Sequence, residues 1–194
     1  MFNGIIYNQG KVHKINVTKK GTSIFVHSKN LISKKKIGMS IAVDGVCLTL
    51  VSYKKNILEF YLLRETINRS KFKYTKKGDI VNLELPLKFG QDISGHICQG
   101  HIDATSKVLK ISKNGNSRIL EFNINKNYKK LLIEKASILI NGVSLTISRV
   151  TKKGFEIWLI PHTLKLTNLS NIKINTVVNI EFDILSKYVK NYIS

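Results

Sequence analysis

The stretch Ser40-Ile41-Ala42-Val43-Asp44-Gly45-Val46-Cys47-Leu48-Thr49-Leu50 has a similar second copy 97 positions later in the chain. The second copy is Ser137-Ile138-Leu139-Ile140-Asn141-Gly142-Val143-Ser144-Leu145-Thr146-Ile147. Each copy has two short apolar runs around Asp-Gly or Asn-Gly, dipeptides that accept the positive φ of a tight hairpin turn. Each copy is therefore predicted to form a β-hairpin. The difference with a chemical consequence is Cys47 in the first copy and Ser144 in the second.

The similarity extends beyond the hairpins and indicates an internal duplication. At the same spacing, 59–66 aligns with 156–163 and 78–85 aligns with 175–182. At a spacing of 96, 4–12 aligns with 100–108. We therefore predict two units of roughly 90–100 residues each. The predicted limits are 1–97 and 98–183, followed by a tail, 184–194.

Short apolar runs that alternate with polar residues predict an all-β fold. Six or so strands in each unit favour two tandem six-stranded closed barrels over a sandwich. The expected strands of the first unit are 1–12, 23–27, the hairpin 40–50, 56–63 and 80–85. Those of the second are 100–111, 118–124, the hairpin 137–147, 155–160 and 176–182. A loop or short helix is expected at 30–37, a linker at 86–93 and a short helix at 128–134.

The tail has no counterpart in the first unit and is predicted to be a helix. Its apolar residues recur at helical spacing and form one stripe. The stripe consists of Ile184, Leu185, Tyr188, Val189, Tyr192 and Ile193. It is expected to pack, either on its own barrel or on another copy of the chain.

The formal net charge of +20 comes almost entirely from Lys. A strongly basic chain can bind nucleic acid. Here, however, the lysines are scattered in pairs, mostly at predicted turns, and no stacking-aromatic motif accompanies them. We expect no nucleic-acid partner, and a basic nucleic-acid-binding barrel remains the alternative from another class of function.

The sequence favours a cytoplasmic location without membrane insertion. Cys47 and Cys98 occupy non-equivalent positions in the two units, which argues against a disulfide framework. The N-terminus lacks the basic and apolar regions of a secretory signal. No apolar run approaches the roughly 20 residues needed to span a bilayer.

The junction Gly95-His96-Ile97-Cys98-Gln99-Gly100-His101 contains three side chains that can ligate a metal. On an extended strand His96 and Cys98 share a face and His101 does not. No fourth ligand is evident, so a structural zinc site has little support and no metal is predicted. The glycines instead suggest that the backbone approaches a ligand or another segment closely.

Cys47 and Ser144 have two possible roles. A free Cys often packs as a small buried hydrophobe. Both residues, however, have a Thr two positions later, Thr49 or Thr146, and alternation puts each pair on one strand face. Two pockets with similar polar linings would suit two similar ligands.

These motifs, taken together, resemble the riboflavin synthase alpha-chain family over essentially the whole chain. The matching residues are Met1-Phe2-x-Gly4-Ile5, Asp44-Gly45-Val46-Cys47-Leu48-Thr49, Glu65-Thr66, Lys88-Phe89-Gly90, Gly95-His96-x-x-x-Gly100-His101-Ile102-Asp103, Asn141-Gly142-Val143-Ser144-Leu145-Thr146, Leu159-Ile160-Pro161-His162-Thr163-Leu164 and Lys187-Tyr188-Val189. Each motif alone is weak. All of them, in order on a duplicated frame, are specific.

The resemblance implies two Greek-key barrels, a homotrimer held by C-terminal helices, and no cofactor. It implies a transferase that binds two 6,7-dimethyl-8-ribityllumazine molecules at each site. One molecule gives a four-carbon unit to the other, which yields riboflavin and 5-amino-6-ribitylamino-uracil in the last step of riboflavin biosynthesis. Association with lumazine synthase is a further possible partnership. The alternative within the same fold is a lumazine-binding antenna protein that holds the ligand without converting it.

The resemblance also assigns the site residues. It assigns chemistry to Ser40, Cys47 and His101, with His101 or a water moving a proton of the C7 methyl group. Ser40 and Cys47 would position or activate the nucleophile that adds at C7 of the partner. The implied N-terminal pocket contains Gly4, Ile5, Ile6, Cys47, Leu48, Thr49, Tyr61, Leu62, Leu63, Arg64, Glu65 and Thr66. The implied C-terminal pocket contains Gly100, His101, Ile102, Lys135, Ser144, Leu145, Thr146, Trp158, Leu159, Ile160, Pro161, His162 and Thr163.

Overall fold

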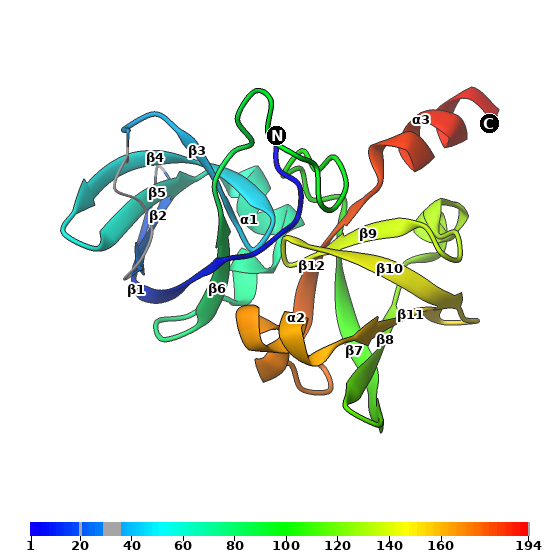
Figure 1. Ribbon diagram of the computed structural model, residues 1–194. Coiled ribbons are helices and arrows are strands. Elements are labelled where there is room, and N and C mark those ends of the chain that lie inside the picture. Colours follow the sequence, from blue (N-terminus) through cyan, green and yellow to red (C-terminus); the bar gives the residue numbers. More distant parts are fainter. Residues whose placement is uncertain (20, 29–35, 194) are drawn as a thin grey trace.

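The computed structural model describes residues 1–19, 21–28 and 36–193 as two β-barrels side by side and a C-terminal helix (Figure 1). The predicted loop or short helix at 30–37 lies mostly outside these residues. The N-terminal barrel consists of β1 (Asn8–Thr18), β2 (Gly21–His27), β3 (Ser40–Val43), β4 (Val46–Lys54), β5 (Ile57–Leu62) and β6 (Ile80–Glu84). The C-terminal barrel consists of β7 (Ala104–Asn114), β8 (Ser117–Asn123), β9 (Ser137–Ile140), β10 (Val143–Val150), β11 (Gly154–Leu159) and β12 (Val177–Phe182).

Both barrels close in the same strand order, which confirms the predicted duplication and the Greek-key fold. The first order is β1-β2-β5-β4-β3-β6, and the second is its equivalent, β7-β8-β11-β10-β9-β12. The strands form because their side chains alternate between core and surface. In β4, for example, Leu48 and Leu50 are buried in the barrel, whereas Cys47 and Thr49 lie on the outer face.

Two short helices pack beside the strands and were missed by sequence periodicity. These are α1 (Arg64–Arg69) and α2 (Pro161–Leu166), each followed by a 3-10 turn, η1 (Lys71–Tyr74) or η3 (Asn168–Asn171). Six residues are too few to display an apolar stripe. The helix predicted at 128–134 is instead the 3-10 turn η2 (Lys126–Leu131). The predicted tail helix is α3 (Ile184–Ile193), which points away from both barrels in Figure 1.

The first residues of each repeat lie on the other repeat's barrel, so the strands predicted to start at 1 and 100 start later. Ile6 is buried in the core of the C-terminal barrel, and Ile102 packs against the core of the N-terminal barrel. The two crossing segments meet where Phe2 and Cys98 exchange backbone hydrogen bonds of 2.8 and 3.0 Å. Gly4, at φ +76°, turns the first segment toward the second barrel.

A buried glutamate holds each crossing segment. Glu84 Oε1 accepts the N–H groups of Asn3 and Gly4 at 2.8 and 3.1 Å. Glu181, its counterpart in the second repeat, accepts those of Gln99, Gly100 and His101 at 2.6–2.9 Å. Burial raises the pKa of both carboxyl groups, that of Glu84 to about 7, because desolvation outweighs the hydrogen bonds.

The two hairpin turns meet back to back between the barrels. Asp44 and Asn141 both have φ +47°, followed by Gly45 and Gly142 at φ +79° and +80°, as the sequence predicted for two-residue turns. A Cβ on Gly45 would lie 2.8 Å from the backbone nitrogen of Gly142, and the reverse contact would be 2.7 Å. Only glycine fits at either position, so the two turns fix how the barrels sit on each other.

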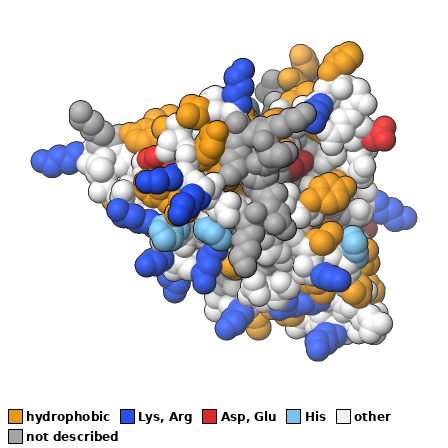
Figure 2. Space-filling view, turned by 60° about the vertical axis from the view of Figure 1, so that its left-hand side comes forward, with side chains coloured by type: hydrophobic (Ala, Val, Ile, Leu, Met, Phe, Trp, Pro, Cys, Tyr) orange, Lys and Arg blue, Asp and Glu red, His pale blue; other side chains and the backbone are white. Residues whose placement is uncertain are grey.

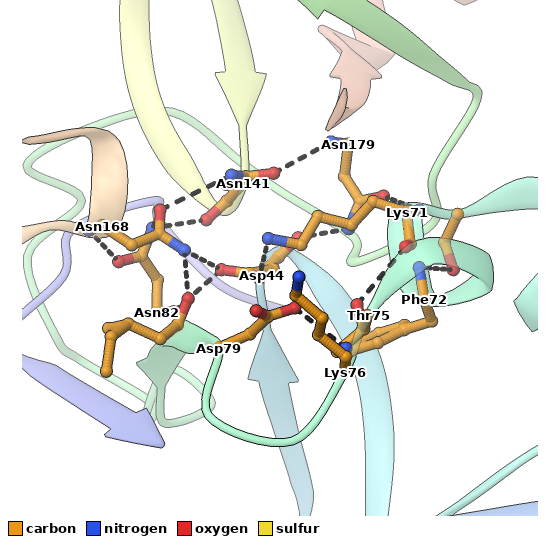
Figure 3. A network of polar contacts seen from close by, with 12 residues as sticks. Asp44, Lys71, Phe72, Thr75, Lys76, Asp79, Asn82, Asn141, Asn168 and Asn179 are labelled. Atoms are coloured by element: carbon orange, nitrogen blue, oxygen red, sulfur yellow. Dashed lines mark hydrogen bonds and ion pairs between the residues drawn. The ribbon is translucent and has the colours of Figure 1, made fainter. Parts of the chain in front are cut away.

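Amide side chains surround this contact with nearly two-fold symmetry (Figure 3). Asn82 Nδ2 donates to the Asn141 carbonyl and Asn179 Nδ2 donates to the Asp44 carbonyl, both at 2.9 Å. The symmetry breaks at one pair. In the first repeat, Oδ2 of the buried Asp44 lies 2.6 Å from Lys71 Nζ. The equivalent residues of the second repeat are Asn141 and Asn168. The sequence alone gave no sign of this network, because its members are scattered polar residues.

We expect Lys71→Met to destabilise the chain by about 3–5 kcal/mol, because burial already raises the pKa of Asp44 and the variant removes the cation that stabilises its ionised form. The pair Asp44→Asn with Lys71→Asn copies the second repeat and should stay within about 1 kcal/mol of wild type. Urea unfolding at pH 7 measures both, with Lys76→Met, an exposed lysine nearby, as the control. Equal losses in the single and the paired variant would contradict this explanation.

Glu84 should make the fold more stable in mild acid. Its folded pKa of about 7 exceeds the ordinary 4.5, so between these values the folded state binds a proton that the unfolded state does not. Stability therefore rises as pH falls through this window, by up to roughly 3 kcal/mol for Glu84. Urea unfolding at pH 5 and pH 8 should show a smaller difference in Glu84→Gln than in wild type. Exposed Asp92→Asn should keep the wild-type difference, and an unchanged difference in Glu84→Gln would refute the assignment.

Candidate active site

One cavity brings together residues that the sequence placed far apart. It has a volume of about 380 Å³ and lies where the N-terminal barrel meets the segment that follows Cys98. Its lining comes from β4, from α1 and its flanks, and from the crossing segment. The lining residues are Val46, Cys47, Leu63, Glu65, Thr66, Arg69, Ser70, Gly100, His101, Ile102 and Asp103.

Close backbone contact holds Cys47 and the crossing segment together. The Cys47 N–H donates to the Gly100 carbonyl at 2.9 Å. Gly100 has φ +80°, and a Cβ there would lie 2.5 Å from the Cβ of Cys47. The predicted close approach of a glycine backbone is therefore found here. His101, the next residue, is exposed at the cavity, so its imidazole and the Cys47 thiol belong to one site.

An open surface continues from the cavity across the outside of the N-terminal barrel. Thr49 is exposed, and Ser40 lies opposite it in the β3–β4 register. Directly opposed residues share a face, so Ser40, Cys47 and Thr49 lie on the same outer surface. Ser40 is outside the cavity lining, at the far end of this hairpin. Tyr61 and Leu63 add apolar area, with 40% and 62% of their surfaces exposed.

The C-terminal barrel presents an equivalent surface. Ser137 is opposite Thr146, and Trp158 and Ile160 occupy the positions of Tyr61 and Leu63 with 47% and 56% exposed. His162 and Lys135 are exposed, and Thr163 is half-buried. Pro161 is the first residue of α2. Two exposed apolar surfaces at duplicated positions therefore suit two flat ligands of the same kind.

The structure changes which residues belong to which site. Gly4 lies against Ser144, whose N–H donates to the Gly4 carbonyl at 2.8 Å, so the segment 4–6 belongs with the C-terminal surface. The segment 100–102 belongs with the N-terminal cavity. The grouping inferred from the resemblance was therefore wrong for both segments, because the repeats exchange their first residues. The alignment of one repeat with the other cannot reveal such an exchange.

Several predicted contact residues are partly or wholly in the cores. Ile6, Leu48, Leu62 and Leu159 are buried, and Leu145 packs against the C-terminal core. They support the two surfaces from beneath. Ile5 is half-buried and Arg64 is exposed beside Glu65.

His96 covers the hydroxyl of Ser144 in the second site. Its Nδ1 lies 2.7 Å from Ser144 Oγ, and Gly95 beside it has no room for a Cβ. Burial lowers the pKa of His96, although the nearby Asp183 acts in the opposite direction, so this environment favours the neutral imidazole. The two sites are thus chemically different. Cys47 faces a cavity with His101, whereas Ser144 is hydrogen-bonded to His96.

The three possible metal ligands of the junction point to different places. His96 contacts Ser144, Cys98 is buried against Phe2, and His101 lines the cavity. Burial, followed by the charge of Glu181, raises the pKa of the Cys98 thiol far above neutrality, so this side chain packs as a neutral thiol. Within residues 1–19, 21–28 and 36–193 no three His, Cys, Asp or Glu side chains are grouped as metal ligands.

On the face seen in Figure 2, Lys and Arg are spread out and do not merge into one continuous patch. Among the residues that the structure describes, no helix is long and apolar enough to cross a membrane.

Sequence reasoning missed Glu84 and Glu181, which hold the crossing segments, and Asp103, Arg69 and Ser70 at the cavity. A signal for the two glutamates was present. They occupy equivalent positions of the repeat, on strands that are otherwise buried on both faces.

Comparisons with known proteins agree with the geometry. The model of the lumazine binding domain matches residues 3–86 and again 99–183. The chain is 34% identical to the riboflavin synthase of Actinobacillus pleuropneumoniae over 193 residues, covering 100% of this chain and 90% of that protein. It is 37% identical to the riboflavin synthase of Photobacterium leiognathi, covering 100% and 89%.

Solved structures share the fold. LumP complexed with 6,7-dimethyl-8-(1'-D-ribityl) lumazine has a TM-score of 0.85 at 23% identity, covering 94% of this chain and 99% of that chain. LumP complexed with riboflavin has a TM-score of 0.85 at 25% identity with the same coverage. Two lumazine-binding repeats and full-length similarity to riboflavin synthases confirm the predicted resemblance: the chain belongs to the riboflavin synthase family of lumazine-binding proteins.

Proposed function

We propose that the chain is a riboflavin synthase, a transferase that converts two molecules of 6,7-dimethyl-8-ribityllumazine into riboflavin and 5-amino-6-ribitylamino-uracil. The observation that carries the proposal is the cavity that joins Cys47 and His101 beside the exposed Tyr61–Leu63 surface. The equivalent exposed surface of the C-terminal barrel, around Ser144 and Trp158, is the second surface. Donor and acceptor are the same molecule, so the reaction needs two similar surfaces.

The arrangement supports a division of roles. Two bound heterocycles held face to face replace a bimolecular encounter, an advantage on the order of 10⁵ M or more in effective molarity. His101, exposed at the cavity, would move a proton of the C7 methyl group, directly or through a water. Cys47 and Ser40 share the outer face and would orient or activate the group that adds at C7 of the partner.

Incubation of the purified protein with 6,7-dimethyl-8-ribityllumazine tests the proposal. Riboflavin absorbance and fluorescence should grow while lumazine is consumed. Tight binding without turnover would favour the antenna function, for which the likeness to LumP is the specific observation. Salt-sensitive RNA binding without lumazine affinity would favour the nucleic-acid alternative.

The two catalytic candidates should respond differently to substitution. Cys47→Ser should keep turnover within about tenfold of wild type, because Ser144 shows that the repeat accepts a hydroxyl there. His101→Ala should lower turnover by about 100-fold or more, which is the usual contribution of general acid–base catalysis to a rate. His13→Ala, an exposed histidine of β1, is the control. Equal losses in both variants, with unchanged circular dichroism, would count against a specialised His101.

We infer that the active assembly is a homotrimer held by α3. Leu185, Tyr188, Val189 and Tyr192 have between 56% and 84% of their surfaces exposed, so self-association rather than docking on its own barrel accounts for the apolar stripe. Such an assembly would let the N-terminal surface of one chain face the C-terminal surface of another. A partnership with lumazine synthase stays a prediction.

Two further assignments are proposals of the same kind. The free state of Cys47 and Cys98 supports a reducing, cytoplasmic location. The limits 1–97, 98–183 and 184–194 divide the chain by repeat and tail, although the crossing segments lie on the other barrel in space.

Leu185→Ser with Val189→Ser should separate the trimer into monomers that still bind lumazine and turn it over much more slowly. These positions share the exposed face of α3, and the substitution removes apolar area that is worth roughly 1.5–3 kcal/mol per side chain when buried. Sedimentation and turnover are measured together, with Asn191→Ser on the same helix as the control. A variant that remains trimeric, or monomers with full turnover, would exclude this assembly.

A further inference from the structure

Two residues of the matching motifs, Asp103 and Lys187, have no role in the function proposed above, yet they form an ion pair. Lys187 Nζ lies 3.1 Å from Asp103 Oδ1 and 3.0 Å from Oδ2. The side chain of Lys187 is only 23% exposed, and that of Asp103 is 20% exposed. A pair that is largely shielded from solvent is screened less than a surface pair.

Asp103 ends the wall segment, defined here as residues 99–103, which carries His101 along one side of the cavity. Residues 180–187 hold this segment along its length. Glu181 accepts the N–H groups of Gln99, Gly100 and His101. The Asp103 N–H donates to the Ile180 carbonyl at 3.0 Å, and the Phe182 N–H donates to Asp103 Oδ2 at 2.8 Å.

Lys187 reaches this segment from α3. It sits on the first turn and a half of the helix, which begins at Ile184. Its charge also acts on Glu181: it lowers the pKa of that carboxyl group, whereas burial raises it. Lys187 therefore favours the ionised Glu181 that accepts three N–H groups of the wall segment. Lys190, three residues later, donates to the Asn127 carbonyl at 3.1 Å.

We propose that Lys187 is a positioning residue for the site: through its ion pair with Asp103 it holds the wall segment so that His101 faces the cavity beside Cys47. The inference rests on the proposed function. It makes the geometry of the cavity depend on this one side chain of α3. The helix that carries the exposed apolar stripe is thereby joined to the site by one ion pair.

Lys187→Met in the full-length protein tests the proposal against Lys190→Met, the same substitution three residues later. Displacement of a catalytic group by about 1 Å can lower the reaction rate on the order of 100-fold. We therefore expect kcat to fall about tenfold or more in Lys187→Met. KM should change less than about threefold, because the apolar surface that binds the ligand is intact. Lys190→Met should keep wild-type kcat. Lys187→Arg, which retains the cation, should recover most of the loss.

A double-mutant cycle separates positioning from general damage. Asp103→Asn keeps an acceptor for the Phe182 N–H and removes the charge, so it should lower kcat by a similar factor. Adding Lys187→Met to it should cost little more. Additive losses would overturn the proposal, as would equal kcat in Lys187→Met and Lys190→Met.

Sedimentation of each variant completes the test. A fall in kcat that follows loss of the wild-type oligomer, and disappears at concentrations where the variant reassembles, would show that Lys187 acts through assembly and would overturn the positioning role. If the wild-type protein converts no lumazine at all, the proposed function fails. If the wild-type protein and the Lys187 variants convert lumazine at the same rate, only the positioning role fails.

Discussion

The arrangement of the whole molecule depends on the contact between Gly45 and Gly142. At that point two hairpin turns from different barrels approach so closely that neither glycine has room for a Cβ. The turns carry backbone N–H and C=O groups into the interface, and buried polar groups are costly unless they are paired. Asn82 and Asn179 supply the missing partners. Each lies on the strand beside the turn of its own barrel and donates a hydrogen bond to the turn of the other barrel. The relative placement of the barrels is therefore set by hydrogen-bond geometry as well as by apolar packing.

This placement explains why each site is built from both repeats. With the turns fixed back to back, the first residues of each repeat run across the interface and contact the position after the opposite turn, Ser144 or Cys47. The buried carboxylates Glu84 and Glu181 then hold these segments by their N–H groups. The cavity around Cys47 is therefore lined by residues of both repeats, and the surface around Ser144 is likewise in contact with the first residues of the chain.

The sequence predicted the features that depend on local patterns. The Asp-Gly and Asn-Gly turns, the outward Cys47–Thr49 pair and the α3 stripe follow from turn chemistry and periodicity, which are read within a few residues. The exchange of crossing segments was not predictable, because the repeat alignment is identical whether 4–6 packs on its own barrel or on the other. The helices α1 and α2 were too short to display a period. The role of His96 was missed because nothing in its neighbourhood along the chain identifies Ser144 as its partner.

Several departures from symmetry lie where the proposed reaction needs them. A dismutation begins with two identical molecules and ends with two different ones, so equal surfaces serve for binding but unequal side chains are needed for chemistry. The surfaces are alike, with Tyr61 and Leu63 matched by Trp158 and Ile160. The chemical groups are not: Cys47 and His101 line an open cavity, whereas Ser144 is hydrogen-bonded to the half-buried His96. His101 itself corresponds to Ile5 in the other repeat, so an imidazole is present at one site and an apolar side chain at its equivalent. The two barrels present similar surfaces, and the difference comes from the exchanged segments together with the residue pair Cys47 and Ser144.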